Sequence, residues 1–178
     1  MYVVCDRGRV LRPLTCAEWP ALYMLMRERG FPHVPATPEA AYGRFEGVEI
    51  LGIFEQQRLV CGFMFGEPEE GVAFFDVVCA EDMQGLWATP RILKALFGYA
   101  FETLKLRAVW VQSQKGRPLR AALQAGFTPV TPLNAPDPVL VMTRWSVPQR
   151  LRPEQCDDDK EMNDGKFICE HEKGFGAA

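Results

Sequence analysis

The sequence predicts a single α/β domain, of the α+β kind, in which helices flank both faces of a mixed sheet of about six to seven strands. Two observations predict this class. Apolar residues recur every second position in some segments and every third or fourth position in others, which indicates strands and helices. Three strand-like runs also follow one another before a helix leads to a further strand, an order that requires antiparallel hairpins and a crossover in one sheet.

Length and composition indicate one domain with a single hydrophobic core. The chain has 178 residues, 48% of them hydrophobic, which suits one domain and is too short for two comfortable ones. The net charge of −3 argues against a nucleic-acid partner. No apolar run approaches the roughly 18–20 residues that span a bilayer, and the N-terminus lacks the apolar stretch of a signal peptide. We therefore expect a cytoplasmic protein with no membrane partner.

The first 45 residues are predicted to hold a strand and two helices. Residues 10–14 are strand-like. Thr15 and Glu18 have the capping-box spacing, which predicts that a helix begins here and runs to Gly30. Thr37 followed by proline is a second N-cap, and it predicts a short helix through about residue 45.

The middle of the chain is predicted to be three strands. Residues 49–55 and 58–65 are apolar runs that form a hairpin, and Gly62 within the second predicts a bulge or a close backbone approach. Residues 72–79 are apolar on both faces except at Asp76, which predicts a central strand.

The remaining elements alternate helix and strand. Thr89 followed by proline begins the strongest helix, whose apolar face continues to Leu104. A buried strand at 109–111, a short helix at 118–125 closed by Gly126, and a final strand at 139–145 follow. These elements complete a domain of residues 1–146.

The last segment, residues 147–178, has a different composition. Its eight acidic and five basic residues give a net charge of −3, equal to that of the whole chain, and apolar residues are sparse. Such a segment is expected to be disordered alone and to become ordered on binding a protein partner, within an oligomeric assembly. No metal is expected, because the six cysteines are dispersed, and Cys61 and Cys79 lie in strand-like runs as small buried hydrophobes.

Residues 72–127 resemble the acetyl-CoA-binding half of the GNAT N-acetyltransferase superfamily. The passage YAFETLKLRAV at 99–109 resembles the family's AF-E-LGL-RV, and RAALQAGF at 120–127 resembles its closing helix. With a first strand at 10–15, the resemblance covers most of residues 9–145. It implies acetyl-CoA as cosubstrate and a small-molecule or protein amine as acceptor.

The resemblance also implies a set of site residues. Its glycine-containing loop binds a pyrophosphate with backbone N–H groups at a helix N-terminus, and here that loop is QGLWAT at 84–89. The general base on the preceding strand corresponds to Asp76, for which a non-catalytic surface carboxylate is the alternative. The implied cofactor contacts are Val77, Val78, Cys79, Gln84, Gly85, Trp87, Ala88, Thr89 and Lys115.

Several motif positions depart from the family pattern. Trp87 and Thr89 occupy the places of two small residues, Lys115 replaces an asparagine, and Ala122 replaces the tyrosine that serves as general acid. Two functions therefore stay open. One is an N-acetyltransferase with a degraded acyl-CoA motif. The other is a catalytically inactive GNAT-fold structural or assembly protein, such as a bacteriophage virion component, which would dock through its tail and reside in the host cytoplasm or the virion. A Trp87 ring inside the groove between strands 72–79 and 109–111 would exclude the cofactor, and an outward ring would leave the groove open.

Overall fold

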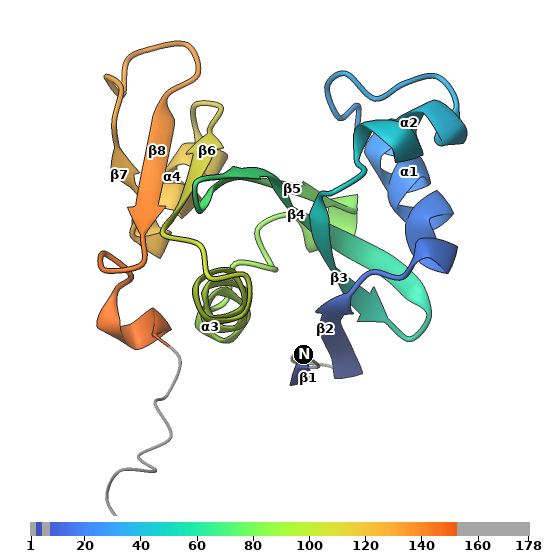
Figure 1. Ribbon diagram of the computed structural model, residues 1–178, viewed down its shortest axis with the longest axis horizontal. Helices are drawn as coiled ribbons and strands as arrows, with labels where there is room; N and C mark the ends of the chain where they lie inside the picture. Colours follow the sequence, from blue (N-terminus) through green and yellow to red (C-terminus); the bar gives the residue numbers. More distant parts are fainter. Residues whose placement is uncertain (1–2, 5–7, 153–178) are drawn as a thin grey trace, which may run out of the picture.

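The computed structural model describes residues 3–4 and 8–152, and these form one mixed sheet with helices on both faces (Figure 1). The strand order is β1-β2-β3-β4-β5-β6-β8-β7, and every neighbouring pair is antiparallel except β5 and β6. The sheet confirms the predicted class, and the edge strands β1 and β7 are additions to it. The strands are β1 (Val3–Val4), β2 (Arg9–Pro13), β3 (Glu49–Glu55), β4 (Arg58–Glu69), β5 (Val72–Cys79), β6 (Ala108–Gln112), β7 (Thr128–Pro129) and β8 (Val139–Thr143).

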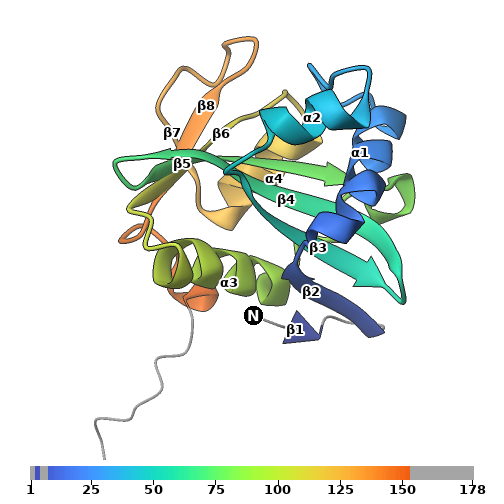
Figure 2. The same cartoon turned by 45° about the vertical axis from the view of Figure 1, so that its right-hand side comes forward.

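Each face of the sheet has its own pair of helices and its own apolar cluster. The helices are α1 (Trp19–Glu28), α2 (Pro38–Arg44), α3 (Pro90–Gly98) and α4 (Arg117–Ala125). Helices α1 and α2 cover one face, where Leu22 and Met26 pack with Met64 and Val78. Helix α3 and the end of α4 cover the other face (Figure 2), which holds the larger cluster.

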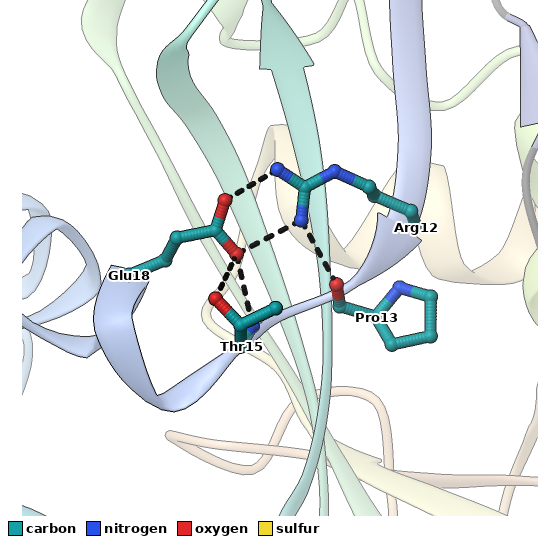
Figure 3. A network of polar contacts seen from close by, with 4 residues as sticks. All are labelled: Arg12, Pro13, Thr15 and Glu18. Atoms are coloured by element: carbon teal, nitrogen blue, oxygen red, sulfur yellow. Dashed lines mark hydrogen bonds and ion pairs between the residues drawn. The ribbon is translucent and has the colours of Figure 1, made fainter.

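The start of α1 is fixed by the predicted capping pair. A 3-10 turn, η2 (Cys16–Glu18), precedes the helix, and Thr15 donates to Glu18 Oε2 from its N–H at 2.9 Å and its hydroxyl at 2.8 Å (Figure 3). Arg12 of β2 donates to both oxygens of the same carboxylate. These bonds, that of Arg12 first, hold the pKa of Glu18 at about 2. Strand β2 and the turn that leads into α1 are thereby joined through one carboxylate.

Gly62 lies where the Leu22 side chain of α1 packs onto the sheet. It faces Gly52 of β3, and a Cβ at Gly62 would lie 2.6 Å from Leu22 Cδ1. The close neighbours of Gly62 are thus side chains of Leu22 and Val78 and not another backbone, which was the prediction, and the register shift lies at Ile53 and Phe54 instead.

The long predicted helix is not uniform. Helix α3 ends at Gly98 and continues as a π-helical turn, η4 (Tyr99–Thr103), so the prediction of one regular helix to Leu104 was wrong. The wider turn buries three consecutive residues, Tyr99, Ala100 and Phe101, which a 3.6-residue repeat cannot place on one face. Strand β4 likewise continues to Glu69, beyond the predicted end at residue 65.

The beginning of the acidic segment belongs to the core. Val147 and Leu151 are buried, and the 3-10 turn η5 (Gln149–Leu151) packs against α3. The rest of the proposed docking segment, residues 153–178, lies outside the described residues. Within the described part of the chain, no helix is long and apolar enough to cross a membrane.

Candidate functional site

The parallel pair at the centre of the sheet separates along its length. Strand β5 pairs with β6 only at Val72–Phe74, opposite Ala108–Trp110. Beyond this point β5 continues to Cys79 and β6 to Gln112 without pairing with each other. The two parts of the sheet diverge around α3, which is seen end-on in Figure 1. This interval, in which residues 75–79 of β5 and 111–112 of β6 no longer pair with each other, is called the opening below.

Backbone groups of β5 point into this opening. Ala80 N donates to Val60 O at 2.9 Å, and the regular register between β4 and β5 then directs the N–H and C=O of Val78 and Asp76 toward β4. The alternate residues, Val77 and Cys79, must direct theirs toward β6, which has already separated. Val78 presents no backbone group to the opening, and its side chain is buried under α1.

Asp76 lies beside the opening, on the sheet face that α1 and α2 cover. Its Oδ1 accepts the Val77 N–H at 2.7 Å, so one of the backbone donors in the opening is occupied by this carboxylate. Burial raises the pKa of Asp76 to about 6, and the Val77 hydrogen bond partly opposes that rise. The carboxylate is half-buried and forms no ion pair within the described residues.

The loop at 84–89 lies at the start of α3, where a phosphate group would meet helix N–H groups. A 3-10 turn, η3 (Glu81–Met83), leads into it, and Gly85 has a φ of 76°, which favours glycine. Gln84, Gly85 and Leu86 are exposed, and Ala88 is half-buried. This conformation keeps the backbone of Gly85 accessible.

The helix N-terminus offers few unpaired donors. Pro90 has no N–H, Thr89 Oγ1 accepts the Ile92 N–H at 3.3 Å, and Leu93 N donates to Thr89 O. Among the described N–H groups in the first turn of α3, that of Arg91 is therefore the one left to bind an anion. The Thr89 cap therefore leaves fewer N–H groups exposed at this helix start than an uncapped start would.

Trp87 packs inward on the α3 face. Its ring is half-buried and meets the Phe63 ring of β4 edge-on, with centroids 5.3 Å apart. Phe63 in turn stacks on Phe75 of β5. The side chain therefore belongs to the packing of the core beside the opening, and neither of the two orientations considered from the sequence describes it fully.

Charged groups near the loop are neutralised in pairs. Glu81 pairs with Arg29 at 3.7 Å, and Asp82 with Arg58 at 3.3 Å, so the two acids are balanced by cations from α1 and β4. Lys115 is exposed in the turn before α4, and its Nζ donates to Asn134 O at 3.0 Å. No cluster of three metal-ligating side chains occurs in the described ranges 3–4 and 8–152.

A hollow of about 460 Å³ lies on the same face as Asp76. Val72, Phe74 and Asp76 alternate along β5 and so share that face, and Phe74 and Trp110 face each other across the β5–β6 pair. Their ring centroids are 4.6 Å apart. The lining residues are Glu69, Glu70, Val72, Phe74 and Trp110.

This hollow was missed in the sequence. The alternation that places Val72 and Phe74 with Asp76 could be read from the chain, but the pairing of Phe74 with Trp110 depends on the register of two strands joined by a long crossover. No local pattern specifies that register.

Comparisons with known proteins bear on the fold. No protein-family model matches the sequence, and no curated protein matches it. Among solved structures, spermidine N-acetyltransferase from Vibrio cholerae in complex with CoA and spermine has a TM-score of 0.63 at 15% identity, over 78% of this chain and 96% of that one. A ribosomal alpha-N-protein acetyltransferase, RimL, in complex with coenzyme A has a TM-score of 0.61 at 16% identity, over 80% and 98%.

Both similar structures are N-acetyltransferases of the GNAT type, and the similarity extends over nearly their whole length. The single mixed sheet flanked by helices agrees with that fold. The chain has the fold of the GNAT N-acetyltransferases.

Proposed function

We propose that the chain is an N-acetyltransferase that takes acetyl-CoA as acyl donor and transfers the acetyl group to an amine. The observation that carries this proposal is the opening between β5 and β6, with the backbone groups of Val77 and Cys79 directed into it and Asp76 adjacent. The Val77 N–H is already bound by Asp76, but the remaining N–H and C=O groups that β6 does not pair suit a ligand that contains amides, because they pair with it as a further strand would. Acetyl-CoA, when bound, supplies the acetyl group as a thioester.

Asp76 is the residue proposed to accept the amine proton. An amine must lose a proton before its nitrogen can act as a nucleophile. One carboxylate oxygen is held by the Val77 N–H, which leaves Oδ2 for the acceptor. A pKa of about 6 keeps Asp76 ionised at neutral pH while making it a stronger base than an ordinary aspartate.

The hollow, which lies on the same sheet face as Asp76, supports a cationic amine as the acceptor. The aromatic pair Phe74 and Trp110 provides faces that attract an alkylammonium group, and Glu69 and Glu70 at the rim have exposed side chains. Arg107 is the nearby cation, and its guanidinium is bound to the Glu70 carbonyl oxygen at 2.9 Å from Nε. The spermidine N-acetyltransferase acts on such an amine, and RimL acts on a protein N-terminus, so both classes are the first acceptors to test.

The acceptor assignment is tested at Trp110. Acetylation of spermidine and of a short peptide N-terminus is measured for the parent chain and for Trp110→Leu, at saturating acetyl-CoA. Loss of the aromatic face should raise KM for spermidine several-fold, since an exposed cation–π contact contributes about 0.5–1 kcal/mol or more. Val130→Ala, an exposed position outside the hollow, is the control. An unchanged KM in Trp110→Leu would exclude the hollow as the acceptor site.

The donor site is tested first by titration calorimetry of the full chain with acetyl-CoA, at concentrations that detect a Kd of up to about 1 mM. Acetyl transfer is then followed by the mass of the amine product. Asp76→Asn should leave the Kd of acetyl-CoA unchanged and lower kcat by about a hundred-fold or more, as expected for loss of a general base. No binding by the parent chain would contradict the enzyme proposal.

The second candidate is a GNAT-fold protein without catalysis that acts through a partner. One observation favours it: the Thr89 cap and Pro90 leave one first-turn N–H at α3 for a pyrophosphate. This candidate predicts no acetyl-CoA binding and a partner held by the segment 147–178. Comparison of the oligomeric size of the full chain with that of a chain ending at Arg152 tests it, and equal sizes in the native source extract would count against a docking tail.

A further inference from the structure

Two cysteine side chains lie opposite each other at the edge of the opening. Cys61 of β4 and Cys79 of β5 are directly opposed in the antiparallel register, so their side chains point to the same face of the sheet. That face is the α3 side, where Cys61 is fully buried and Cys79 packs against the cluster while remaining partly exposed. Both are free thiols.

The register fixes how close the two residues are. Ala80 N donates to Val60 O, so residues 60 and 80 form a hydrogen-bonded pair and the neighbouring residues 61 and 79 a non-hydrogen-bonded pair. In such pairs the Cα atoms are about 4.5 Å apart and the Cβ atoms are at their closest. Disulfides join residues whose Cα atoms are about 4.4–6.8 Å apart, so this position can be bridged without moving either strand.

The two thiols differ in access and interact with each other. The neighbouring Cys79 thiol, together with burial, raises the pKa of Cys61 well above its ordinary value, while Arg9 acts weakly in the opposite direction. Cys61 therefore stays protonated and unreactive as long as Cys79 is a thiol. Conversion of Cys79 to a disulfide removes the first cause of that rise in the pKa of Cys61, while the contribution of burial remains.

We propose that Cys61 and Cys79 are a reversible redox pair, in which Cys79 reacts with a low-molecular-weight disulfide and Cys61 then closes an intramolecular disulfide. The Cys79 thiolate attacks the small disulfide, a new S–S bond forms, and one small thiol leaves. The Cys61 thiolate then attacks the Cys79 sulfur, and the second small thiol leaves. The protein loses two electrons and two protons, and the small disulfide gains both and becomes two thiols.

The order of attack follows from exposure. Cys79 is the last residue of β5, beside the opening, where a small molecule can reach it, whereas Cys61 has no exposed surface. Cys16 is exposed but lies near the Tyr42 hydroxyl, with a sulfur–oxygen distance of 3.9 Å, and has no described cysteine opposite it. Within the described residues it is therefore a candidate for a mixed disulfide only. The reaction needs no acetyl-CoA and does not depend on the proposed function.

The test treats the folded full chain with oxidised glutathione, blocks remaining thiols with an alkylating reagent, and maps the peptides. Trypsin alone leaves Cys61 and Cys79 in one peptide, because no Lys or Arg lies between Arg58 and Arg91. Cleavage after Glu69 and Glu70 separates them, so a disulfide joins two peptides that a thiol reductant releases. The expected result is this linked pair, formed under native conditions and fully reversed by dithiothreitol.

Two variants test separately the reaction of Cys79 with glutathione and the closing attack by Cys61. Cys61→Ala should trap glutathione on Cys79, and Cys79→Ala should leave Cys61 unmodified in the folded chain. Both are read by mass under native conditions, with Cys16 in each chain as the internal standard for an exposed thiol. Modification of Cys16 without the Cys61–Cys79 link in the parent chain would overturn the proposal. Reaction of Cys61 in Cys79→Ala would overturn the order of attack.

Discussion

Asp76 lowers the stability of the folded chain, and the same burial makes it suitable as a base. The strand places it among apolar neighbours, and burial penalises its charged form, with one Val77 N–H as partial compensation. Its pKa rises from 3.8 to about 6. A shift of this kind, in a half-buried carboxylate beside an opening, is typical of functional sites and costs folding free energy.

The raised pKa of Asp76 predicts how the free energy of unfolding depends on pH. A raised carboxyl pKa destabilises the folded chain once the group is ionised, so the penalty is absent below about pH 3.8 and complete above about pH 6. Asp76→Asn should therefore raise the free energy of unfolding at pH 7.5 by about 1–3 kcal/mol, with the difference from the parent vanishing near pH 4. Urea unfolding at both pH values measures it. An equal difference at both values would show that the effect is not ionisation.

At the scale of elements, the N–H groups at the start of α3 can either be capped by Thr89 or bind a phosphate. Thr89 stabilises the helix by capping it, and the cap consumes an N–H that a phosphate would use. Helix α2 begins in the same way, with Thr37 Oγ1 accepting the Ala40 N–H at 3.3 Å before a proline at the first helical position. The two caps are chemically matched, and only one lies beside the opening.

This match gives a controlled experiment. Thr89→Ala and Thr37→Ala should each lower the free energy of unfolding by about 1 kcal/mol, the usual value of an N-cap. Only Thr89→Ala frees an N–H at the proposed donor site, so it alone should lower the Kd of acetyl-CoA in calorimetry. Equal Kd values in both variants would place the pyrophosphate elsewhere.

The junction after α4 depends on a single glycine. Gly126 ends the helix with a φ of 103°, and a Cβ there would lie 2.4 Å from Pro148 Cγ. Gly126→Ala should lower the free energy of unfolding by about 2 kcal/mol or more, because backbone strain adds to overpacking against a rigid ring. Gly43→Ala in α2 meets no atom within 4 Å and should raise it by about 0.5–1 kcal/mol. Thermal unfolding of both variants checks the contrast, and a stable Gly126→Ala would contradict it.

For the whole molecule, the core extends past the last strand. Leu151 is 1% exposed and packs in the cluster under α3, together with Val147. The first residues of the acidic segment therefore close the core that holds α3 against the sheet, and with it the loop at 84–89.

Leu151→Ala tests this extension. It should lower the free energy of unfolding by about 2–5 kcal/mol, as for other buried leucines, whereas Gln149→Ala at the exposed side of the same turn should change it by less than about 0.5 kcal/mol. Denaturant unfolding measures both. A small effect of Leu151→Ala would mean that the domain is complete without this turn.

The sequence by itself determined the fold class, the element order and the two helix caps, because hydrophobic period, Thr-Pro pairs and terminal glycines act over a few residues. It also pointed to Asp76 and to the loop at 84–89. The tertiary structure alone decided where β5 and β6 separate, that Phe74 meets Trp110 and that Cys61 faces Cys79. Those facts depend on strand register across turns and a crossover, and register is set by the packing of whole faces, which no local run of residues specifies.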